Sequence, residues 1–306
     1  MSPPPEIRDA LAAALARVNP DVHAQLAAAL SRVYAPGCAQ SCWEWVHASI
    51  IITPDESRDH PGPYEGLLTI YVKRLFDFIN APAAIEKELI IRKSAQLGFT
   101  LAYLLIICYL AAVHPTHILF GMDSVKEAKN ISLRLKRLLT TNRSLADVFT
   151  AEGDEDLQNL FLRLRGMDVH LVGSGSAGAY ANKSVGLVIL DELDKHIAAP
   201  GGHANTIDLG RDRIKKVEEG KLIAGGTPAD YEGETNQNFL TGTREELHAP
   251  CPHCAHFQPF RWEQMRFDHC KDLTGKWDYE RVLAETWLEC ELCKQPIRDA
   301  DKARLL

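Results

Sequence analysis

The 306-residue sequence predicts an α/β fold, in which a mostly parallel β-sheet is flanked by helices. Short apolar runs alternate with helical stretches between residues 88 and 226, a pattern typical of a doubly wound sheet. Residues 187–190 are continuously apolar, as in a strand that is buried on both faces. Two Cys-x-x-Cys pairs follow and indicate a separate small β module. We therefore expect an N-terminal helical segment (1–80), an α/β domain (81–245) and a cysteine-containing module (246–306).

The composition is that of an ordinary globular protein and excludes two other classes. Hydrophobic residues make up 46% and charged residues 25% of the chain, which is long enough for one large core and an appendage. The net charge of −7 excludes a uniformly basic nucleic-acid-binding protein. The longest apolar run, residues 101–113, is too short to span a membrane, and no signal-peptide pattern begins the chain. We expect no membrane association and a cytosolic location.

Helices are expected in the N-terminal segment. Residues 7–18 and 22–33 are rich in alanine, which has the highest helix propensity. Apolar residues recur at helical spacing in residues 67–80, after a loop rich in proline, glycine and charge.

The central part is expected to alternate strands with helices. The predicted strands are residues 89–91, 116–120, 161–165, 169–172, 187–190 and 222–224. The predicted helices are residues 101–112, 124–140 and 205–219. Ser124 and Glu127 have the spacing of a capping box at the start of the second helix. The third and fourth strands are expected to pair around Gly166.

The loop between the first strand and its helix is the most informative segment. A small-residue turn in this position directs backbone N–H groups and a helix N-terminus at an anion. Compared with the pattern G-x-x-x-x-G-K-[ST], Gly98 and Thr100 are in place, but Phe99 occupies the lysine position. Lys93 stands at the opening of the loop, where its flexible side chain can still reach a phosphate. The ordinary start of a buried helix is the alternative interpretation of this loop alone.

A second, acidic motif favours the phosphate-binding interpretation. Residues 187–190 run into Asp191 and Glu192, at the end of the strand where α/β sheets bind ligands. In P-loop ATPases an Asp in this place holds Mg²⁺ and an adjacent Glu polarises the attacking water. A buried strand that ends in an exposed acidic turn is common, but both motifs in this order on one chain indicate an ATPase.

The ATPase hypothesis assigns a role to each motif. Thr100 and Asp191 would bind Mg²⁺, Glu192 would be the catalytic carboxylate, and Lys93 would hold the β- and γ-phosphates of ATP. Thr227, in a Gly-Gly-Thr-Pro segment after a short strand, would sense the γ-phosphate; a plain turn is the alternative. The residues expected to contact ATP are Lys93, Ser94, Ala95, Gln96, Leu97, Gly98, Phe99, Thr100 and Asp191. The candidates for an additional cation at the γ-phosphate are Arg92, Arg143, Arg211 and Arg213.

The cysteines predict a zinc site. Cys251 and Cys254 form one pair and Cys290 and Cys293 the other, and i, i+3 spacing lets both thiolates of a pair face one Zn²⁺ ion. The pairs are 35 residues apart, which is longer than the common zinc-ribbon interval. The residues that compete with them as ligands are His253, His256, His269 and Cys270. The cysteines expected to be free thiols in apolar surroundings are Cys38, Cys42 and Cys108.

Together these motifs resemble the large subunit of tailed-phage terminases, in the lambda-like branch. The resemblance begins at about residue 40 and rests on five features in the family's order. They are residues 92–100 as a Walker A motif with a shifted lysine, the Ser184-Val185-Gly186 lead-in, residues 187–192 as a Walker B motif with its catalytic Glu, Gly226-Thr227-Pro228 as the coupling motif, and the two cysteine pairs.

The resemblance implies a motor that hydrolyses ATP to package double-stranded viral DNA into procapsids in the host cell cytoplasm. It also implies a terminase small subunit, a portal and further copies of the same chain as partners. The family carries a metal-dependent nuclease domain after the cysteine region; since this sequence stops at Leu306, we expect that domain and its endonuclease activity to be absent. Two alternatives remain: a helicase-like P-loop ATPase with a zinc ribbon, and a non-enzymatic zinc-ribbon module for DNA binding or assembly.

Overall fold

The computed structural model describes residues 40–149, 159–175, 184–197 and 205–304. The chain divides into two compact units, Met1–Ser41 and Cys42–Leu306. The helices predicted at 7–18 and 22–33, and Cys38, lie outside the described residues. The domain limits at 80/81 and 245/246 stay predictions.

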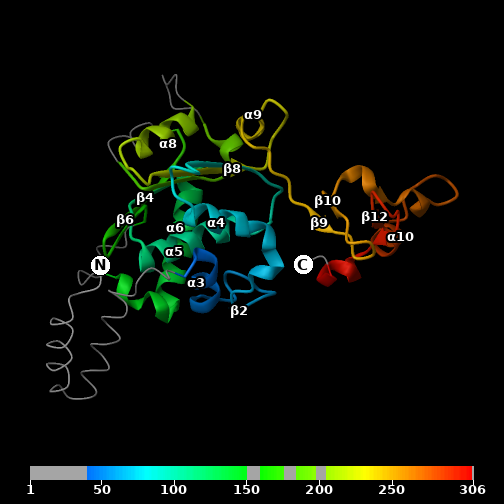
Figure 1. Cartoon of the computed structure of the whole chain (residues 1–306), viewed down its shortest axis with the longest axis horizontal. Coiled ribbons are helices and arrows are strands. Elements are labelled where there is room, and N and C mark those ends of the chain that lie inside the picture. The colour runs from blue at the N-terminus through cyan, green and yellow to red at the C-terminus, as the bar shows by residue number, and fades with distance from the viewer. Residues whose placement is uncertain (1–39, 150–158, 176–183, 198–204, 305–306) are drawn as a thin grey trace, which may run out of the picture. The chain divides into compact units, whose positions relative to one another are not determined.

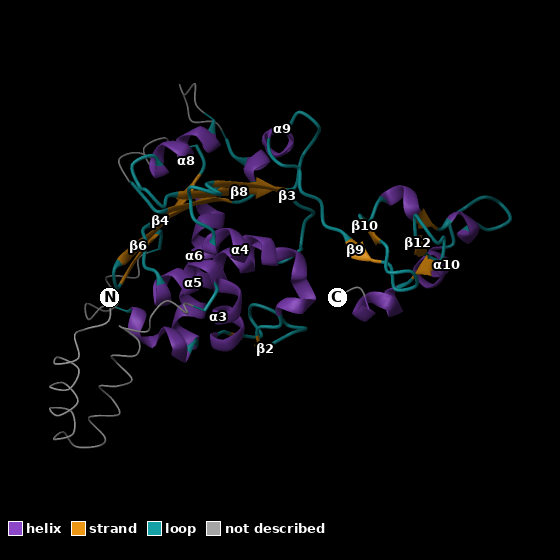
Figure 2. Ribbon diagram, in the orientation of Figure 1, coloured by secondary structure: helices purple, strands orange, loops and turns teal. Residues whose placement is uncertain are grey.

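A mostly parallel sheet of six strands is the centre of the second unit, within the described residues (Figures 1 and 2). Its strands are β3 (Glu88–Arg92), β4 (Ile118–Met122), β5 (Phe161–Leu164), β6 (Met167–Gly173), β7 (Leu187–Leu190) and β8 (Lys221–Gly226), in the order β3-β8-β7-β4-β6-β5. Only β5 runs antiparallel to its neighbour, through the turn at Gly166. The predicted fold class is therefore confirmed. β8, which is last in sequence, lies between β3 and β7.

Helices cover both faces of this sheet (Figure 2). On one face lie α3 (Cys42–Ser49), α4 (Lys73–Asn80), α5 (Phe99–Val113) and α6 (Val125–Thr141), and on the other α8 (Thr206–Ile214) and α9 (Glu234–Thr241). Side chains of one strand alternate between the two cores, as in β7, where Ile189 joins the larger core and Val188 the smaller. The sheet is thus buried on both sides, which explains its continuous apolar runs.

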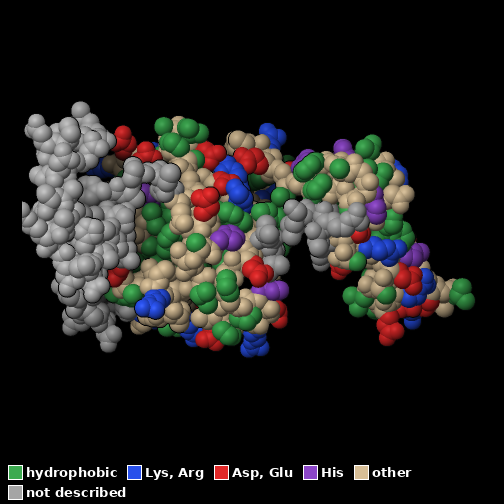
Figure 3. All heavy atoms as spheres, turned by 60° about the horizontal axis from the view of Figure 1, so that its bottom comes forward, with side chains coloured by type: hydrophobic (Ala, Val, Ile, Leu, Met, Phe, Trp, Pro, Cys, Tyr) green, Lys and Arg blue, Asp and Glu red, His purple; other side chains and the backbone are tan. Residues whose placement is uncertain are grey.

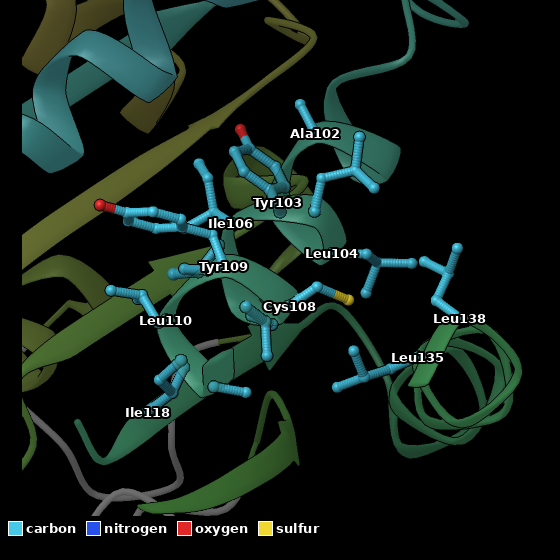
Figure 4. Close-up of a cluster of buried hydrophobic side chains, with 14 of the residues drawn as sticks. Ala102, Tyr103, Leu104, Ile106, Cys108, Tyr109, Leu110, Ile118, Leu135 and Leu138 are labelled. Atoms are coloured by element: carbon cyan, nitrogen blue, oxygen red, sulfur yellow. The ribbon is translucent and has the colours of Figure 1, made fainter. Parts of the chain in front are cut away.

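The larger core is centred on α5, which is buried along most of its length (Figure 4). Tyr103 and Cys108 are fully buried, and Leu135 and Leu138 of α6 pack against the same cluster. Burial of an aliphatic or aromatic side chain contributes about 1.5–3 kcal/mol, so this helix anchors the loop that precedes it.

The helix ends differ in detail from the prediction. The Ser124 hydroxyl accepts a hydrogen bond from the Glu127 N–H group (3.2 Å), but the Glu127 carboxylate accepts from the Asn130 side chain (3.1 Å) instead of completing a capping box. The helix expected at 205–219 ends at Ile214. The stretch 67–80 contains a 3₁₀ helix, Gly66–Val72, kinked at Thr69, before α4 begins.

The C-terminal residues form small antiparallel strands. These are β9 (Ala249–Pro250), β10 (Phe257–Gln258), β11 (Met265–Arg266), β12 (Trp287–Glu289) and β13 (Pro296–Ile297), with the helix α10 (Tyr279–Glu285) between β11 and β12. A further short pair, β1 (Ile51–Ile52) and β2 (Gly62–Pro63), lies before α4. Among the described residues, none of the helices combines the length and hydropathy that a bilayer crossing requires.

Candidate active site and cysteine cluster

The loop from β3 to α5 has the local geometry of an anion-binding turn. Gln96 and Gly98 adopt left-handed backbone conformations, with φ of 60° and 76°. Gly98 is the N-cap of α5, and its carbonyl accepts from the Ala102 N–H group at 3.1 Å. The first turn of α5 therefore directs its N–H groups into the loop, as the sequence predicts.

Lys93, at the start of this loop, contacts both carboxylates that follow β7. Its Nζ lies 2.8 Å from Glu192 Oε1 and 3.3 Å from Asp191 Oδ1. The side chains of Lys93 and Asp191 are almost completely buried, so each compensates the other's charge. The structure thus brings Lys93 to two adjacent acidic residues that lie about a hundred positions later in the sequence.

Thr100 joins the same cluster from the first turn of α5. Its hydroxyl donates to Asp191 Oδ2 at 2.7 Å, while Asp191 Oδ1 accepts from the Glu192 N–H group at 3.0 Å. A hydroxyl and a carboxylate oxygen in contact are hard ligands of the kind that Mg²⁺ prefers. The pair Thr100 and Asp191 therefore fits the ion that the sequence predicts there.

Glu192 sits in a left-handed backbone conformation (φ 56°) just past the strand. Its second carboxylate oxygen pairs with Lys195 Nζ at 2.9 Å. Burial by itself raises the pKa of Glu192, but the hydrogen bonds and charges of Lys93 and Lys195 outweigh burial and lower the pKa below its ordinary value. Glu192 is consequently a carboxylate at neutral pH, the form that can polarise a water molecule.

His196 supports the same strand end and was missed by the sequence analysis. Its Nε2 is 2.8 Å from the Asp191 carbonyl oxygen. Burial lowers the pKa of His196, so the ring is neutral near pH 7, and Nε2 carries the hydrogen because a carbonyl can only accept. A histidine five residues after the acidic residue is a weak signal in sequence, which explains the omission.

Two glycines of β8 allow Lys93 to reach the acids across an intervening strand. The Lys93 N–H group donates to the Gly226 carbonyl at 3.1 Å. A Cβ atom on Gly226 would lie 3.0 Å from the Leu193 nitrogen and 3.1 Å from the Glu192 Cα, and one on Gly225 would overlap Ile91. These positions need glycine for close approach, a role that the sequence analysis did not assign to them.

The segment after β8 is tied to the acidic turn by Asp194. Its Oδ2 accepts from the Ala229 N–H group (2.8 Å) and its Oδ1 from the Thr235 N–H group (2.6 Å) in α9. Thr227 lies between Gly226 and this anchored stretch, and its hydroxyl oxygen is buried without a hydrogen-bond partner in the part of the chain that the structure describes. The role of Asp194 was also missed, since a surface Asp has no distinctive pattern in sequence.

Two of the four arginine candidates are held by neighbours. Arg92 donates to Asn236 Oδ1 at 2.9 Å and its guanidinium lies 4.3 Å from the centre of the Phe239 ring. Arg211 pairs with Glu88 at 2.9 Å and with Asp208 at 3.0 Å. The remaining candidates are Arg143, at the start of a 3₁₀ turn, and Arg213, in the last turn of α8.

The four predicted zinc ligands form one cluster. Cys251 Sγ is 3.8 Å from Cys293 Sγ, and Cys254 Sγ is 3.8 Å from Cys290 Sγ. Thiolates placed tetrahedrally at about 2.3 Å from Zn²⁺ lie about 3.8 Å apart, whereas a disulfide requires about 2.0 Å. The cluster is therefore shaped for a metal ion and can hold zinc.

The two cysteine pairs lie in turns of the same form. Cys251 N–H donates to the His256 carbonyl (2.8 Å) and Cys290 N–H to the Gln295 carbonyl (3.0 Å). Ala255 and Lys294, each just after the second cysteine of a pair, both have φ near 60°. Burial opposes ionisation of Cys290, but hydrogen bonds from the backbone and from other thiols of the cluster lower its pKa to about 6, which favours the thiolate that binds metal.

The competing ligand candidates lie elsewhere. His253 Nε2 contacts the Pro296 carbonyl at 2.9 Å, and His256 Nε2 contacts Glu291 at 2.7 Å. His269 and Cys270 form a separate group with Glu285. As expected, the thiols of Cys42 and Cys108 are buried in the larger core, where burial raises the pKa of both, to about 12 for Cys108.

Comparison with known proteins assigns most of this chain to a family. The family model described as "Phage terminase large subunit gpA, ATPase domain" matches residues 59–306. No curated protein matches the sequence. Among solved structures, the chain is similar to the HK97 bacteriophage large terminase (14% identity, TM-score 0.46, 66% of this chain and 41% of that one). It is also similar to a mutant of the large terminase ATPase domain of Thermus phage P74-26 (16% identity, TM-score 0.41, 65% of this chain and 78% of that one).

The chain thus spans less than half the length of the HK97 protein. The family match, in contrast, covers most of the chain and includes both strand-end motifs and all four clustered cysteines. The chain belongs to the family of phage terminase large subunit gpA ATPase domains.

Proposed function

We propose that this chain hydrolyses ATP at the cluster of Lys93, Asp191 and Glu192, and that hydrolysis drives packaging of double-stranded viral DNA into procapsids. The main support is that the Lys93 ammonium lies within 3.3 Å of both carboxylates, although β8 separates β3, which precedes Lys93, from β7, which precedes the acids. A cation at the end of one strand and two acids at the end of another match the charges of a magnesium-bound triphosphate.

The phosphates of ATP are held by the β3–α5 loop. The loop backbone, Ser94 to Phe99, offers N–H groups next to the α5 N-terminus, and Lys93 supplies the mobile positive charge. When ATP binds, the Lys93 ammonium transfers its contacts from the two carboxylates to phosphate oxygens. That exchange keeps a buried charge paired at every stage, which avoids the cost of desolvating it alone.

Thr100 and Asp191 would hold Mg²⁺, and Glu192 would orient the attacking water. The ion supplies neutralisation of charge on the β- and γ-phosphates. Asp191 is fully buried and oriented by Thr100 and by the Glu192 N–H group, so its oxygens are fixed before the substrate arrives. Glu192, released by Lys93, has a free carboxylate oxygen for a hydrogen bond to water.

The nucleoside part of ATP lies in a cavity beside the loop. This cavity has a volume of about 260 Å³ and is lined by Gly98 and Leu101 on one side and by Ile52, Pro63 and Tyr64 on the other. The volume suits a base and sugar rather than a complete nucleotide, as expected if the phosphates continue into the loop. Thr69 and His60, also in the wall, offer polar contacts to the base.

Thr227 contacts the γ-phosphate of bound ATP. When hydrolysis removes this phosphate, the change is transmitted to α9. Its unpartnered buried hydroxyl oxygen follows Gly226, whose carbonyl holds the Lys93 backbone. Asp194 links the same acidic turn to the first turn of α9. A change of contacts at Glu192 is thereby connected to a helix outside the site.

The cysteine cluster holds a structural Zn²⁺ ion through Cys251, Cys254, Cys290 and Cys293. Four thiolates close the coordination shell and leave no position for a substrate. The module around them buries few apolar side chains, so the ion contributes to its folding.

The partners proposed for the chain are double-stranded DNA, a terminase small subunit, a portal and further copies of the chain, acting in the host cell cytoplasm. DNA is contacted through local groups, because acidic and basic side chains are interspersed on the visible face (Figure 3). DNA cleavage is not assigned to these residues. Among the described residues, the groups of metal-ligating side chains are the four cysteines and the set His269, Cys270 and Glu285, neither of which is a carboxylate cluster.

The proposal is tested by ATP turnover of the purified chain, with and without linear duplex DNA. We expect hydrolysis, with or without stimulation by DNA, that Glu192→Gln reduces by about 100-fold or more, since a positioned carboxylate contributes about 10²–10⁴-fold. Glu218→Gln, the same change at an exposed glutamate, is the control and should leave the rate unchanged. Equal rates in the wild type and Glu192→Gln would overturn the assignment.

A further inference from the structure

The 35 residues between the two cysteine pairs form a substructure with little apolar core. It contains β11, a 3₁₀ turn (Asp268–Cys270) and α10, and no residue of α10 is buried. The core that includes Cys251 and Cys290 has one further buried member, Ile297, which lies outside this insertion. A segment with so little burial usually needs a cross-link or a metal to hold one conformation.

Three metal-ligating side chains meet inside the insertion. His269 Nε2 lies 3.5 Å from Cys270 Sγ and 3.6 Å from Glu285 Oε2. All three ligand atoms lie within 4.8 Å of one another, and the group contains none of the four clustered cysteines. The insertion therefore places a thiol, an imidazole and a carboxylate close enough together to be ligands of one metal ion.

Cys270 differs from the chain's buried structural thiols. Its side chain is fully buried, yet it belongs to none of the hydrophobic clusters of the described residues, whereas Cys42 and Cys108 lie in the larger core. Its sulfur lies 3.5 Å from Nε2 of the His269 ring. A buried cysteine that joins no apolar cluster and contacts an imidazole is a candidate metal ligand rather than a packing residue.

Two of the three distances between the ligand atoms are close to those of tetrahedral coordination. A thiolate at about 2.3 Å and an imidazole nitrogen at about 2.0 Å from Zn²⁺ lie about 3.5 Å apart, which is the distance between Cys270 and His269. A nitrogen and an oxygen ligand lie about 3.3 Å apart, slightly less than the 3.6 Å between His269 and Glu285. The Cys270 sulfur and the Glu285 oxygen lie within 4.8 Å of each other, so both can reach one ion after movement of the carboxylate.

Neighbouring side chains orient the ligands. Arg281 donates to both oxygens of Glu285, at 3.1 Å and 2.9 Å, and a carboxylate has lone pairs enough to bind a metal as well. The Trp287 ring lies 4.8 Å from the His269 ring. Asp278 caps α10 and its N–H group donates to the Cys270 carbonyl at 2.9 Å, which joins the helix to the turn.

We propose that His269, Cys270 and Glu285 bind a second Zn²⁺ ion, with solvent in the fourth position. Nitrogen, sulfur and oxygen ligands in one set favour zinc over magnesium or calcium, which prefer oxygen alone. The ion cross-links the turn at Cys270 to the end of α10. It thereby holds the insertion, which has almost no apolar core, in one conformation. With three protein ligands instead of four, it exchanges faster than the ion of the cysteine cluster.

Zinc content of the full chain tests the proposal. After equilibration with Zn²⁺ and dialysis, elemental analysis should find about two ions per wild-type chain and about one in Cys270→Ser. Glu285→Gln should also approach one, because an amide is a poorer ligand, whereas Glu280→Gln, at an exposed glutamate in the same helix, should keep two. One ion in the wild type, or two in Cys270→Ser, would overturn the proposal.

Titration of the metal-free chain with Co²⁺ distinguishes the loss of one metal site from the unfolding of a variant. The wild type should saturate at about two equivalents, and thiolate-to-cobalt absorption should grow in both steps because each site contains cysteine. Saturation at one equivalent would show that the three residues form only a hydrogen-bonded surface group. Cys270→Ser should keep the first step at full amplitude, which reports that the cysteine cluster is still folded.

Discussion

Glu192 is held between two lysines, Lys93 and Lys195, at 2.8 Å and 2.9 Å. Lys93 is buried and can move to a phosphate, whereas the side chain of Lys195 is 61% exposed and remains as a partner for the carboxylate. At the residue scale, this arrangement makes Glu192 an ionised base and gives it two alternative contacts. The two lysines have different roles: Lys93 would bind the phosphates of ATP, and Lys195 would stay paired with the Glu192 carboxylate.

The ionisation of Glu192 leads to a pH prediction. Because Lys93 and Lys195 lower its pKa below the ordinary value, activity should persist on the acid side until the pH falls through that lowered pKa. Lys195→Gln removes one of the cations, so the pKa rises and the acid limb of the kcat profile should move to higher pH. Lys216→Gln, at an exposed lysine, should leave the profile in place. An unmoved limb in Lys195→Gln would contradict the role of this pair.

Gly226 gives a second prediction at the same scale. Gly226→Ala places a methyl group 3.0 Å from the Leu193 nitrogen and 3.1 Å from the Glu192 Cα, so the acidic turn must shift. We expect a loss of up to about 100-fold in kcat, the effect of a misplacement of about 1 Å. Gly242→Ala, where the new atom has ordinary contacts only, is the matched control. Full activity in Gly226→Ala would show that close approach at β8 is not required.

At the scale of elements, three strand ends and one helix start form the site. β3 delivers Lys93, β7 delivers Asp191 and Glu192, and α5 delivers Thr100, while β8 contributes the two glycines that let them meet. α9 is attached to this arrangement through Asp194. Lys93, Thr100 and the two acidic residues all lie at the ends of strands or at the start of a helix. A shift of one of these ends therefore alters every contact of the site.

Most of these elements could be predicted from the sequence, but their spatial order could not. Continuous apolar runs predicted β4, β7 and β8, because burial on both faces leaves that local pattern. An apolar run also predicted the edge strand β3, whose residues are only partly buried or exposed. The position of β8 between β3 and β7 depends on pairing between residues more than a hundred positions apart, which no local pattern encodes. The steric role of Gly226 and the contacts of Asp194 were missed because they too depend on segments that meet only in the folded chain, although these are about 30 to 40 positions apart.

Asp194→Ala tests the connection between the acidic turn and α9. The change leaves the Ala229 and Thr235 N–H groups without their acceptor, and we expect the free energy of unfolding to fall by about 1–3 kcal/mol. Denaturant unfolding measures the loss, and Asp230→Ala, at an exposed neighbour, should be near neutral. Equal stability of the two variants would refute this connection.

At the scale of the whole molecule, one part of the chain is stabilised by hydrophobic burial and another by metal ligation. The α/β core buries large apolar clusters on both faces of its sheet, whereas the cysteine region has a core of three buried residues, two of them cysteines. Metal ligation replaces hydrophobic burial in the latter. The catalytic residues proposed here, Lys93, Asp191 and Glu192, all lie outside the cysteine region, so chemistry and metal-dependent folding are expected to be separable.

Chelation of metal should therefore unfold the cysteine region first. Trp262, Trp277 and Trp287 lie in this region, and Trp43 and Trp45 lie in α3 of the large core, so tryptophan fluorescence reports both parts. A strong chelator should expose the partly buried Trp287 and change its emission, whereas Trp262 is already 73% exposed and should change little. Circular dichroism should retain most of the helical signal. Loss of all structure in a single step, or no change at all, would contradict separable folding.

The most direct test of the central claim is a crystal structure with Mg²⁺ and a non-hydrolysable ATP analogue. We predict that Lys93 leaves Glu192 for the β- and γ-phosphates, that Thr100 and Asp191 share the ion, and that Glu192 faces the γ-phosphate through water. An analogue bound away from the β3–α5 loop, or one that leaves the contacts of Lys93 with both carboxylates unchanged, would contradict the account.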